Sequence, residues 1–326
     1  MVSRQGEGAL VLGASGFIGT RLVRSLVKKG VANVRAVDIA PPRERLDGVD
    51  YRTLDVRERL DPDCGRDVSL IYNLAAVHRT PGHPDGEYYE TNVLGALNTA
   101  ALAEACNIDT IVFTSSISVY GPSEETVFET SPLRPTTAYG RSKRMAERIH
   151  EQWLDGREDR RLIVLRPGVI FGPGERGNYT QLAKALRGRY FFYPGRRDTI
   201  KSGGYVDELL LAINFALDRD DRYILFNYAY PDFSTTQDIV ETFGRVAGRP
   251  YSPPTLPIDP LLWAASLFEA ASALGLKNPI HRARVLKLAQ STKVAPGWLK
   301  ANGYQFSSDL AAALQRWSDE TGGRFA

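Results

Sequence analysis

The stretch ALVLGASGFIG, residues 9–19, decides the fold of this chain, because an apolar run passes directly into glycines spaced as GxxGxxG. Residues 9–12 have the composition of a short buried strand, and residues 21–29 alternate apolar and basic side chains as an amphipathic helix does. Strand, glycine turn and helix in this order form a variant of the dinucleotide-binding fingerprint. Its glycines permit a tight turn and bring a pyrophosphate close to the helix N-terminus. A glycine-rich turn that binds nothing is the alternative interpretation.

The second predicted strand, residues 34–37, ends in Asp38. A carboxylate at this place, about 20 residues beyond the glycines, hydrogen-bonds the adenosine ribose hydroxyls and repels a 2′-phosphate. The sequence therefore favours NAD over NADP, and the nearby loop residue Arg43 does not cancel that preference. Residues 55–56 end the third strand region and are placed to meet the adenine. Residues 73–76 end the fourth strand, where small side chains let the backbone approach the cofactor.

A tyrosine and a lysine stand four positions apart in YGRSK, residues 139–143. On a helix such side chains share a face, so the Tyr139 phenol and the Lys143 ammonium can point into one pocket. A phenol with an unperturbed pKa of ~10 is a weak base at neutral pH, and a neighbouring cation favours its phenolate form. One of the two serines at Ser115-Ser116, upstream in the sequence, can hydrogen-bond the same substrate oxygen. This set predicts removal of a proton from an alcohol while a hydride leaves its carbon.

With these motifs the chain resembles the extended short-chain dehydrogenases/reductases, in the NAD-dependent sugar epimerase/dehydratase group. The resemblance runs from Ala9 to about Lys293 and includes GASGFIG, NLAA, FTSSISVYG, YGRSK and LRPGVIFGPG. It implies an α/β fold, a doubly wound parallel sheet (Rossmann fold) with a smaller, mostly helical C-terminal substrate lobe. We expect the NAD-binding domain over residues 1–166 and about 204–230, and the substrate lobe over about 167–203 and 231–326.

The resemblance also implies roles for individual residues. Catalysis is assigned to Ser116, Tyr139 and Lys143. The residues expected to bind NAD are Gly13, Ser15, Gly16, Phe17, Ile18, Gly19, Asp38, Ile39, Asp55, Val56, Leu74, Ala75, Ala76, Asn92, Thr114, Tyr139, Lys143 and Pro167. The residues expected to bind the substrate are His78, Ser115, Ser116, Asn178, Lys201 and Arg284. For the last three, an exposed solvated side chain is the alternative, and for His78 a loop role unrelated to substrate.

Within this group the chain is similar to bacterial epimerases that act at C4 of an N-acetylhexosamine linked through diphosphate to undecaprenol. AAVHR, EYYETN and GVIFGPGERGN carry that similarity. It implies C4 epimerisation of a nucleotide- or polyprenyl-linked sugar through a transient 4-keto intermediate. The alternatives are a 4-keto-sugar reductase that consumes NAD(P)H, a hydroxysteroid-type dehydrogenase with an apolar pocket, and a binding protein without chemistry.

Two departures from family patterns bear on the reaction. Dehydration is disfavoured, because Ile117 and Ser118 stand where dehydratases usually carry Asp-Glu. Many nucleotide-sugar epimerases carry asparagine at the place of Val169, so the usual diphosphate contact is missing or relocated here.

Composition adds limits of a general kind. A chain of 326 residues with 43% hydrophobic content can bury one large core or two lobes, and its net charge of +3 is dispersed without a nucleic-acid footprint. Two cysteines favour a reducing compartment, and four histidines without ligand spacing predict no metal site. We find no secretory signal or membrane-spanning segment and therefore expect a cytoplasmic protein. We also expect a homodimer. Whether the protein contacts the inner face of the membrane is left open.

That open question rests on residues 261–271, LLWAASLFEAA, which are apolar nearly all round. The segment is too short to span a bilayer, and burial within the substrate lobe is the simpler interpretation. His281, Arg282, Arg284 and Lys287 follow closely. The alternative is a helix that lies in the membrane interface while these cations meet anionic headgroups.

Overall fold

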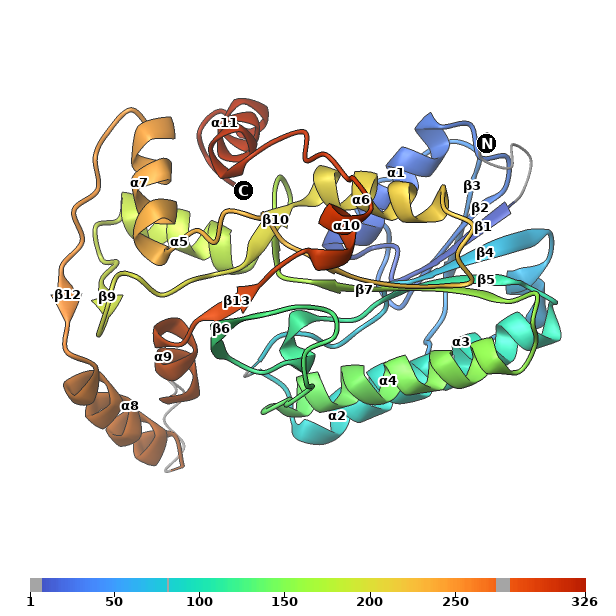
Figure 1. The fold of residues 1–326 in the computed structure, drawn as a ribbon, viewed down its shortest axis with the longest axis horizontal. Coiled ribbons are helices and arrows are strands. Elements are labelled where there is room, and N and C mark those ends of the chain that lie inside the picture. The colour runs from blue at the N-terminus through green and yellow to red at the C-terminus, as the bar shows by residue number, and fades with distance from the viewer. Residues whose placement is uncertain (1–7, 81, 274–281) are drawn as a thin grey trace.

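The computed structural model describes residues 8–80, 82–273 and 282–326. At its centre lies a seven-stranded parallel sheet with the strand order β11-β7-β5-β4-β1-β2-β3 (Figure 1). The strands are β1 (Gly8–Leu12), β2 (Val34–Asp38), β3 (Val49–Thr53), β4 (Val68–Asn73), β5 (Thr110–Thr114), β7 (Arg161–Pro167) and β11 (Tyr223–Tyr228). Every residue of β1 is buried, as expected for a central strand covered on both faces. The order confirms the predicted doubly wound sheet.

Helices cover both faces of this sheet. On one face lie α1 (Phe17–Lys28) and α6 (Val206–Leu217), whose apolar side chains share a core with alternate residues of β1, β7 and β11. On the other face lie α3 (Gly95–Ala105) and α4 (Ala138–Asp155), which share a core with the remaining sheet residues. Figure 1 shows the two layers above and below the sheet. The carboxyl ends of the parallel strands all meet at one edge, which is where ligands bind in such folds.

A second group of elements lies beyond that edge. It contains α5 (Asn178–Arg187), α7 (Thr236–Val246), α8 (Ile258–Ala273), α9 (Arg282–Ala289), α11 (Leu310–Thr321), β8 (Val169–Phe171), β10 (Gly203–Tyr205), β9 (Tyr193–Pro194) and β12 (Thr255–Leu256). Phe171, Tyr179, Phe243 and Trp317 form the aromatic centre of its core. A capping box of Thr235 and Asp238 begins α7.

Short elements join the two groups. They are η1 (Pro62–Gly65), α2 (Asp85–Tyr89), η2 (Glu90–Leu94), η3 (Ile117–Val119), β6 (Ser123–Val127), β13 (Thr292–Val294) and α10 (Gly297–Ala301). β13 pairs with β6, so the chain comes back from α9 to the edge of the sheet next to the loop after β5. α10 then packs on the face that carries α1 and α6, through the buried Leu299.

Candidate active site

The glycine turn after β1 is shaped for a close approach to the neighbouring strand end. Gly13 adopts a φ of +83°, and a Cβ on it would lie 2.7 Å from the Ala75 amide nitrogen. Gly16 caps α1 without any side-chain acceptor, so the positive end of the helix is left open at the turn. Phe17, Ile18 and Gly19 form its first turn. An open helix N-terminus against a glycine turn fits the pyrophosphate of NAD.

Asp38 connects the end of β2 to this turn. Its carboxylate accepts hydrogen bonds from the Ser15 and Ala40 amides, at 2.9 Å each. Ile39 beside it is 64% exposed. Arg43, which the sequence leaves in a loop, donates to the Ser15 carbonyl at 3.0 Å and to the Gly174 carbonyl at 2.8 Å. The carboxylate is therefore held at the turn, and Arg43 ties the turn to the second lobe.

The other expected NAD-binding residues lie along the same sheet edge. Asp55 and Val56 follow β3, where the Asp55 carboxylate pairs with Arg57 at 2.6 Å and Val56 is buried. Leu74, Ala75 and Ala76 follow β4, and the Leu74 amide donates to the Leu12 carbonyl at 2.9 Å. Thr114 ends β5 and Pro167 ends β7. Residues distant in sequence are thus brought to one edge by the parallel sheet.

Tyr139 and Lys143 occupy the first turns of α4, which begins where the Thr137 side chain accepts the Gly140 amide. The Lys143 ammonium donates to the Thr114 carbonyl at 2.8 Å and lies 4.8 Å from the centre of the Phe113 ring. Burial lowers the pKa of Lys143 to about 7, although the charge of Glu147 acts in the opposite direction. Lys143 therefore exchanges its proton near neutral pH.

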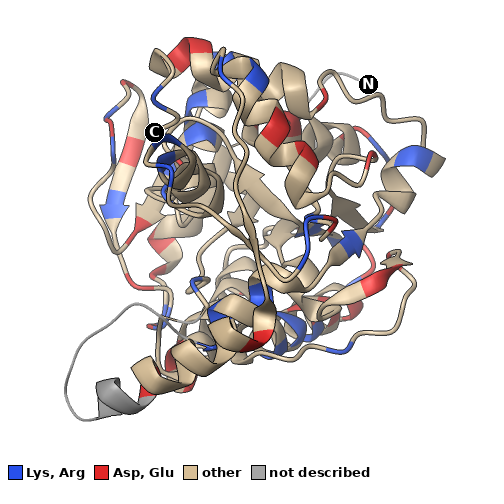
Figure 2. Cartoon of the chain, turned by 90° about the vertical axis from the view of Figure 1, so that its left-hand side faces the viewer, with Lys and Arg blue, Asp and Glu red and all other residues tan. Residues whose placement is uncertain are grey.

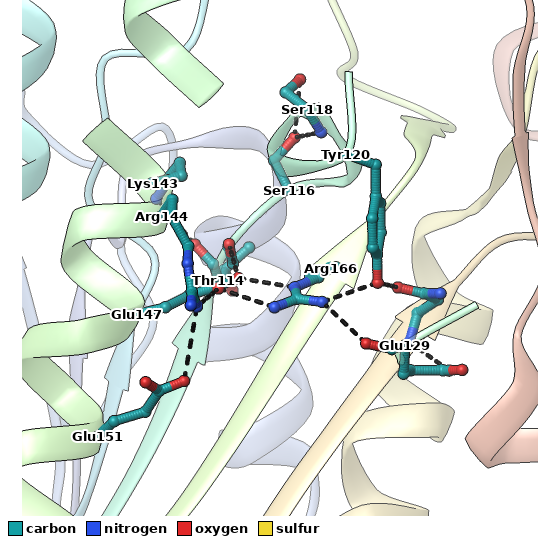
Figure 3. Close-up of polar contacts among 12 residues, drawn as sticks. Thr114, Ser116, Ser118, Tyr120, Glu129, Lys143, Arg144, Glu147, Glu151 and Arg166 are labelled. Carbon is teal, nitrogen blue, oxygen red and sulfur yellow. Dashed lines mark hydrogen bonds and ion pairs between the residues drawn. The ribbon is translucent and has the colours of Figure 1, made fainter. Parts of the chain in front are cut away.

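Ser116 faces the phenol from the loop after β5 (Figure 3 shows Ser116 and Lys143). Its hydroxyl caps η3 by accepting the Ser118 amide at 3.1 Å. Burial raises the pKa of Tyr139, and a hydrogen bond with Ser116 only partly offsets that rise. We expected the lysine to favour phenolate, but in the protein alone desolvation prevails and the phenol stays protonated at neutral pH.

Asn92 fixes the loop that follows β4 from a π-helical turn, η2. Its side-chain amide accepts from the Val77 amide at 3.1 Å and donates to the Val77 carbonyl at 3.2 Å. It also donates to the Ser142 hydroxyl at 2.8 Å, which lies on α4 between Tyr139 and Lys143. Asn92 is 3% exposed, so its contacts are with protein. Its position couples the loop to the helix that carries the tyrosine and lysine.

A buried ion pair lies one turn further along α4, and sequence reasoning missed it. The Glu147 carboxylate accepts two hydrogen bonds from Arg166 of β7, both at 2.8 Å (Figure 3). Arg166 also donates to the Tyr120 hydroxyl at 2.8 Å, and that hydroxyl donates to the Asn227 side chain. The network links α4 with β7, β11 and the loop after β5. The sequence offered one indication that Glu147 belongs near the site: it follows Lys143 by four positions, so both side chains lie on the same face of the helix.

Ser115 belongs to this network. Its hydroxyl donates to the Glu147 carboxylate at 2.6 Å, and the residue is 1% exposed. We expected Ser115 to contact the substrate, but its side chain is directed toward α4, where the Glu147 carboxylate accepts its hydroxyl. Ser116, the next residue, is the one that faces Tyr139.

Lys201 is also placed differently from the expected diphosphate contact. Its ammonium donates to the carbonyls of Lys287 and Gln290, at 2.7 and 2.6 Å, at the C-terminal end of α9. A cation at that end of a helix is favourable, which accounts for the placement. Burial, together with Lys287 and Arg196, lowers the pKa of Lys201 to about 8. Lys201 therefore holds α9 in place.

The remaining expected substrate ligands lie around the sheet edge. Asn178 begins α5 and is exposed. Arg284 is exposed on α9, where desolvation and, to a smaller extent, the charge of Arg284 lower the pKa of the neighbouring Lys287. His78 lies in the loop after β4, where the protein atoms around it and the charges of Arg79 and Lys143 lower its pKa. The surrounding protein atoms have the largest of these effects, so they favour a neutral imidazole for His78 beside the site.

Comparisons with known proteins agree with this geometry. The family described as the NAD dependent epimerase/dehydratase family matches residues 9–227. An N-acetyl-α-D-glucosaminyl-diphospho-ditrans,octacis-undecaprenol 4-epimerase of Escherichia coli O157:H7 is 29% identical over 317 residues, which cover 95% of this chain and 94% of that protein.

Two solved structures share the fold across nearly the whole chain. A UDP-glucuronic acid 4-epimerase from Bacillus cereus in complex with NAD superposes with a TM-score of 0.77 at 18% identity, covering 98% of this chain and 100% of that one. MoeE5 in complex with UDP-glucuronic acid and NAD gives a TM-score of 0.74 at 24% identity, covering 97% and 100%. These likenesses establish the fold of both groups of elements.

Proposed function

Because the chain belongs to the NAD dependent epimerase/dehydratase family, we propose that it epimerises C4 of a diphosphate-linked sugar. The carrier is a nucleotide or a polyprenol, and the sugar is a hexose or N-acetylhexosamine. One observation carries the proposal: Ser116, Tyr139 and Lys143 lie at the same sheet edge as a glycine turn suited to NAD. The match to an undecaprenol-linked 4-epimerase over 95% of the chain supports the position of the reaction on the sugar.

In the proposed mechanism, Tyr139 removes the proton of the C4 hydroxyl and later returns it to the 4-keto sugar after the sugar has turned over in the pocket. NAD⁺, which the glycine turn at Gly13 and the Asp38 carboxylate would hold, would supply a reversible hydride acceptor for C4 and a positive charge that favours ionisation of the phenol. Ser116 hydrogen-bonds the same C4 oxygen. Lys143, while protonated, adds a second positive charge near the phenol. Asn92 and Glu147 keep α4 in register with the strand ends.

The substrate is held from both sides of the sheet edge. Asn178, the first residue of α5, is suited to the diphosphate through its amide. Arg284 on α9 is the second candidate for the diphosphate, and His78 lines the sugar side. Glu175 limits where a phosphate can bind, because its buried carboxylate already accepts the Thr180 amide at 2.9 Å in the first turn of α5.

One incubation separates the proposal from its alternatives. Purified protein is given UDP-GlcNAc or a polyprenyl-diphosphate-linked N-acetylglucosamine, with and without added NADH. Formation of the C4 epimer without added reductant supports the epimerase. Stoichiometric loss of NADH on a 4-keto sugar would instead identify a reductase, and turnover of hydroxysteroids alone would identify a steroid dehydrogenase. Bound NAD without any turnover would leave a binding protein.

We also propose that the protein is a homodimer joined through α3 and α4. Leu97 on α3 and Met145 on α4 are 47% and 48% exposed, and a shallow hollow lined by Leu97, Ala101, Ile149 and Trp153 lies between the helices. Glu104, Arg148 and Arg160 border this apolar hollow. An apolar centre with a polar border suits a self-complementary two-fold interface. Light scattering should show a dimer that Leu97→Glu converts to a monomer, whereas Leu211→Glu, a matched exposed leucine on α6, leaves the mass unchanged. Equal masses for all three proteins would refute it.

A further inference from the structure

Helix α8 presents large apolar side chains to solvent. Trp263 is 74% exposed, and Leu267, one turn later, is 70% exposed. Ala265, on the opposite side of the helix, is fully buried, so α8 packs on the lobe through a narrow face. Most of α8 is tan in Figure 2, where basic residues are blue and acidic residues red. The simpler expectation, that the whole segment is buried within the lobe, is therefore wrong.

Hydrogen bonds join α8 to α9. The backbone amide of Arg282 donates to the Glu269 carboxylate at 2.8 Å, and the Arg282 guanidinium reaches the Ser266 hydroxyl at 3.5 Å. These contacts join the start of α9 to α8. Leu288 on α9 is also exposed, at 52%.

The far end of α9 is fixed at the rim of the candidate active site. The Lys201 ammonium donates hydrogen bonds to the backbone carbonyls at the C-terminal end of α9. The Lys287 ammonium lies 3.5 Å from the Thr80 carbonyl. Thr80 follows His78 in the loop after β4. The contacts thus connect the exposed apolar helix, through α9, to the loop after β4 that carries His78.

Charge on this surface is weakly positive. Within the described residues of α8 and α9, Arg282, Arg284 and Lys287 stand against Asp259 and Glu269. His281, which we expected to add to the cations, lies outside the described residues. A surface of this kind binds lipid mainly through its apolar side chains, with tryptophan suited to the headgroup level and basic residues adding a small attraction.

We propose that α8 and α9 dock on the surface of a lipid bilayer, with Trp263 and Leu267 inserted at the headgroup level. The sugar carrier is then a polyprenyl diphosphate, whose headgroup reaches the site along α9 while its chain stays in the bilayer. This proposal rests on the proposed function for its substrate. The docking surface itself stands on the exposed side chains. The relative that acts on an undecaprenol-linked sugar matches 95% of the chain, which agrees with this carrier.

Trp263 offers a direct probe of docking. It is 74% exposed, whereas Trp153 and Trp317 are buried and Trp298 is partly buried. The full chain is mixed with vesicles of phosphatidylethanolamine and phosphatidylglycerol, or of phosphatidylcholine alone, and sedimented. We expect co-sedimentation with both, somewhat stronger with phosphatidylglycerol, and a blue shift of tryptophan emission that is absent in Trp263→Phe.

Matched variants test which surface binds. Leu267→Glu should lower vesicle binding by about ten-fold or more, because a charge replaces an inserted leucine. Leu211→Glu, an exposed leucine on α6, should bind as the wild type does, and thermal unfolding confirms that both variants are folded. The proposal is overturned if the wild type stays in the supernatant or if Leu267→Glu sediments equally. It is also overturned if Leu267→Glu instead dissociates an oligomer, because α8 would then contact a second copy of the chain.

The carrier is tested separately. N-acetylglucosamine linked to a long polyprenyl diphosphate in vesicles is compared with the same sugar on a short, water-soluble prenyl diphosphate. Leu267→Glu should slow epimerisation of the vesicle substrate about ten-fold and leave the soluble substrate unaffected. Equal rates on both would overturn delivery from the bilayer. Absence of turnover on either substrate, with vesicle binding intact, would contradict the proposed function and leave the docking surface standing.

Discussion

Glu147 of α4 and Arg166 of β7 form a buried two-point ion pair, in which Nε donates to Oε1 and Nη2 donates to Oε2, each at 2.8 Å. Glu147 lies one helical turn from Lys143; burial lowers the pKa of that lysine, and the negative charge of Glu147 partly offsets the effect. Both side chains are almost fully buried, at 1% and 3% exposure. Removing one of these side chains should therefore lower the free energy of unfolding more than breaking a surface ion pair does.

Glu147→Leu should lower the free energy of unfolding by about 3–5 kcal/mol, because Arg166 is left buried without its partner. Arg166→Met should have a similar effect for the same reason. The double variant should lose less than the sum of the two, since neither charge then remains. Urea unfolding of all four proteins measures this coupling, and a strictly additive double variant would contradict it.

Tyr139→Phe should reduce turnover by about 100-fold or more while NAD stays bound, because the phenol is the group placed to exchange the C4 proton. Turnover is followed by C4 epimer formation, and NAD content by release and quantification. Tyr89→Phe, a tyrosine at the end of α2, is the matched control. More than about a tenth of wild-type activity in Tyr139→Phe would exclude the assigned role.

Asp38→Ser should weaken NAD binding and shift relative affinity toward NADP, because the repulsion of a 2′-phosphate is removed. Asp38 also accepts the Ser15 and Ala40 amides, so Asp38→Asn separates the charge from the hydrogen bonds. Titration calorimetry with both nucleotides gives the affinity ratio. If that ratio is the same in the wild type and in both variants, the ribose is recognised by other groups.

Lys143→Met should stabilise the cofactor-free protein most at low pH. Burial lowers the pKa of Lys143 from 10.5 to about 7, so between these values the unfolded chain binds a proton that the folded chain does not. The cost of the buried lysine is complete below pH ~7 and falls as the pH rises toward ~10.5. Thermal unfolding should therefore show a larger gain for Lys143→Met at pH 6.5 than at pH 9. An equal gain at both values would contradict the lowered pKa. Lys28→Met, on the exposed side of α1, is the control.

The sheet and its cofactor edge were predictable because local patterns specify them. The apolar run before Gly13 and the position of Asp38 determine strand, turn and register together, and the parallel sheet then aligns every later strand end. Roles that depend on distant partners were not predictable. Lys201 was expected at a diphosphate but caps α9, whose end lies 86 residues away in sequence at Lys287. Ser115 was expected at the sugar, yet a neighbouring helix supplies its partner, Glu147.

The exposure of α8 was equally hidden in the sequence. An apolar segment is buried or exposed according to what packs against it, and the sequence pattern of residues 261–271 is nearly the same on every side. Only the three-dimensional arrangement distinguishes the buried Ala265 from the exposed Trp263.

The hydrogen bonds between the Asn92 side chain and the Val77 backbone lower the entropy cost of substrate binding. Both backbone groups of Val77 are satisfied by one buried side chain, so the Val77 amide should exchange slowly with deuterium although it belongs to a loop. The rim that carries His78 and Arg79 then starts from a fixed point before any sugar arrives. Substrate binding then avoids part of the entropy loss of ordering that loop, and this preorganisation strengthens affinity for the sugar.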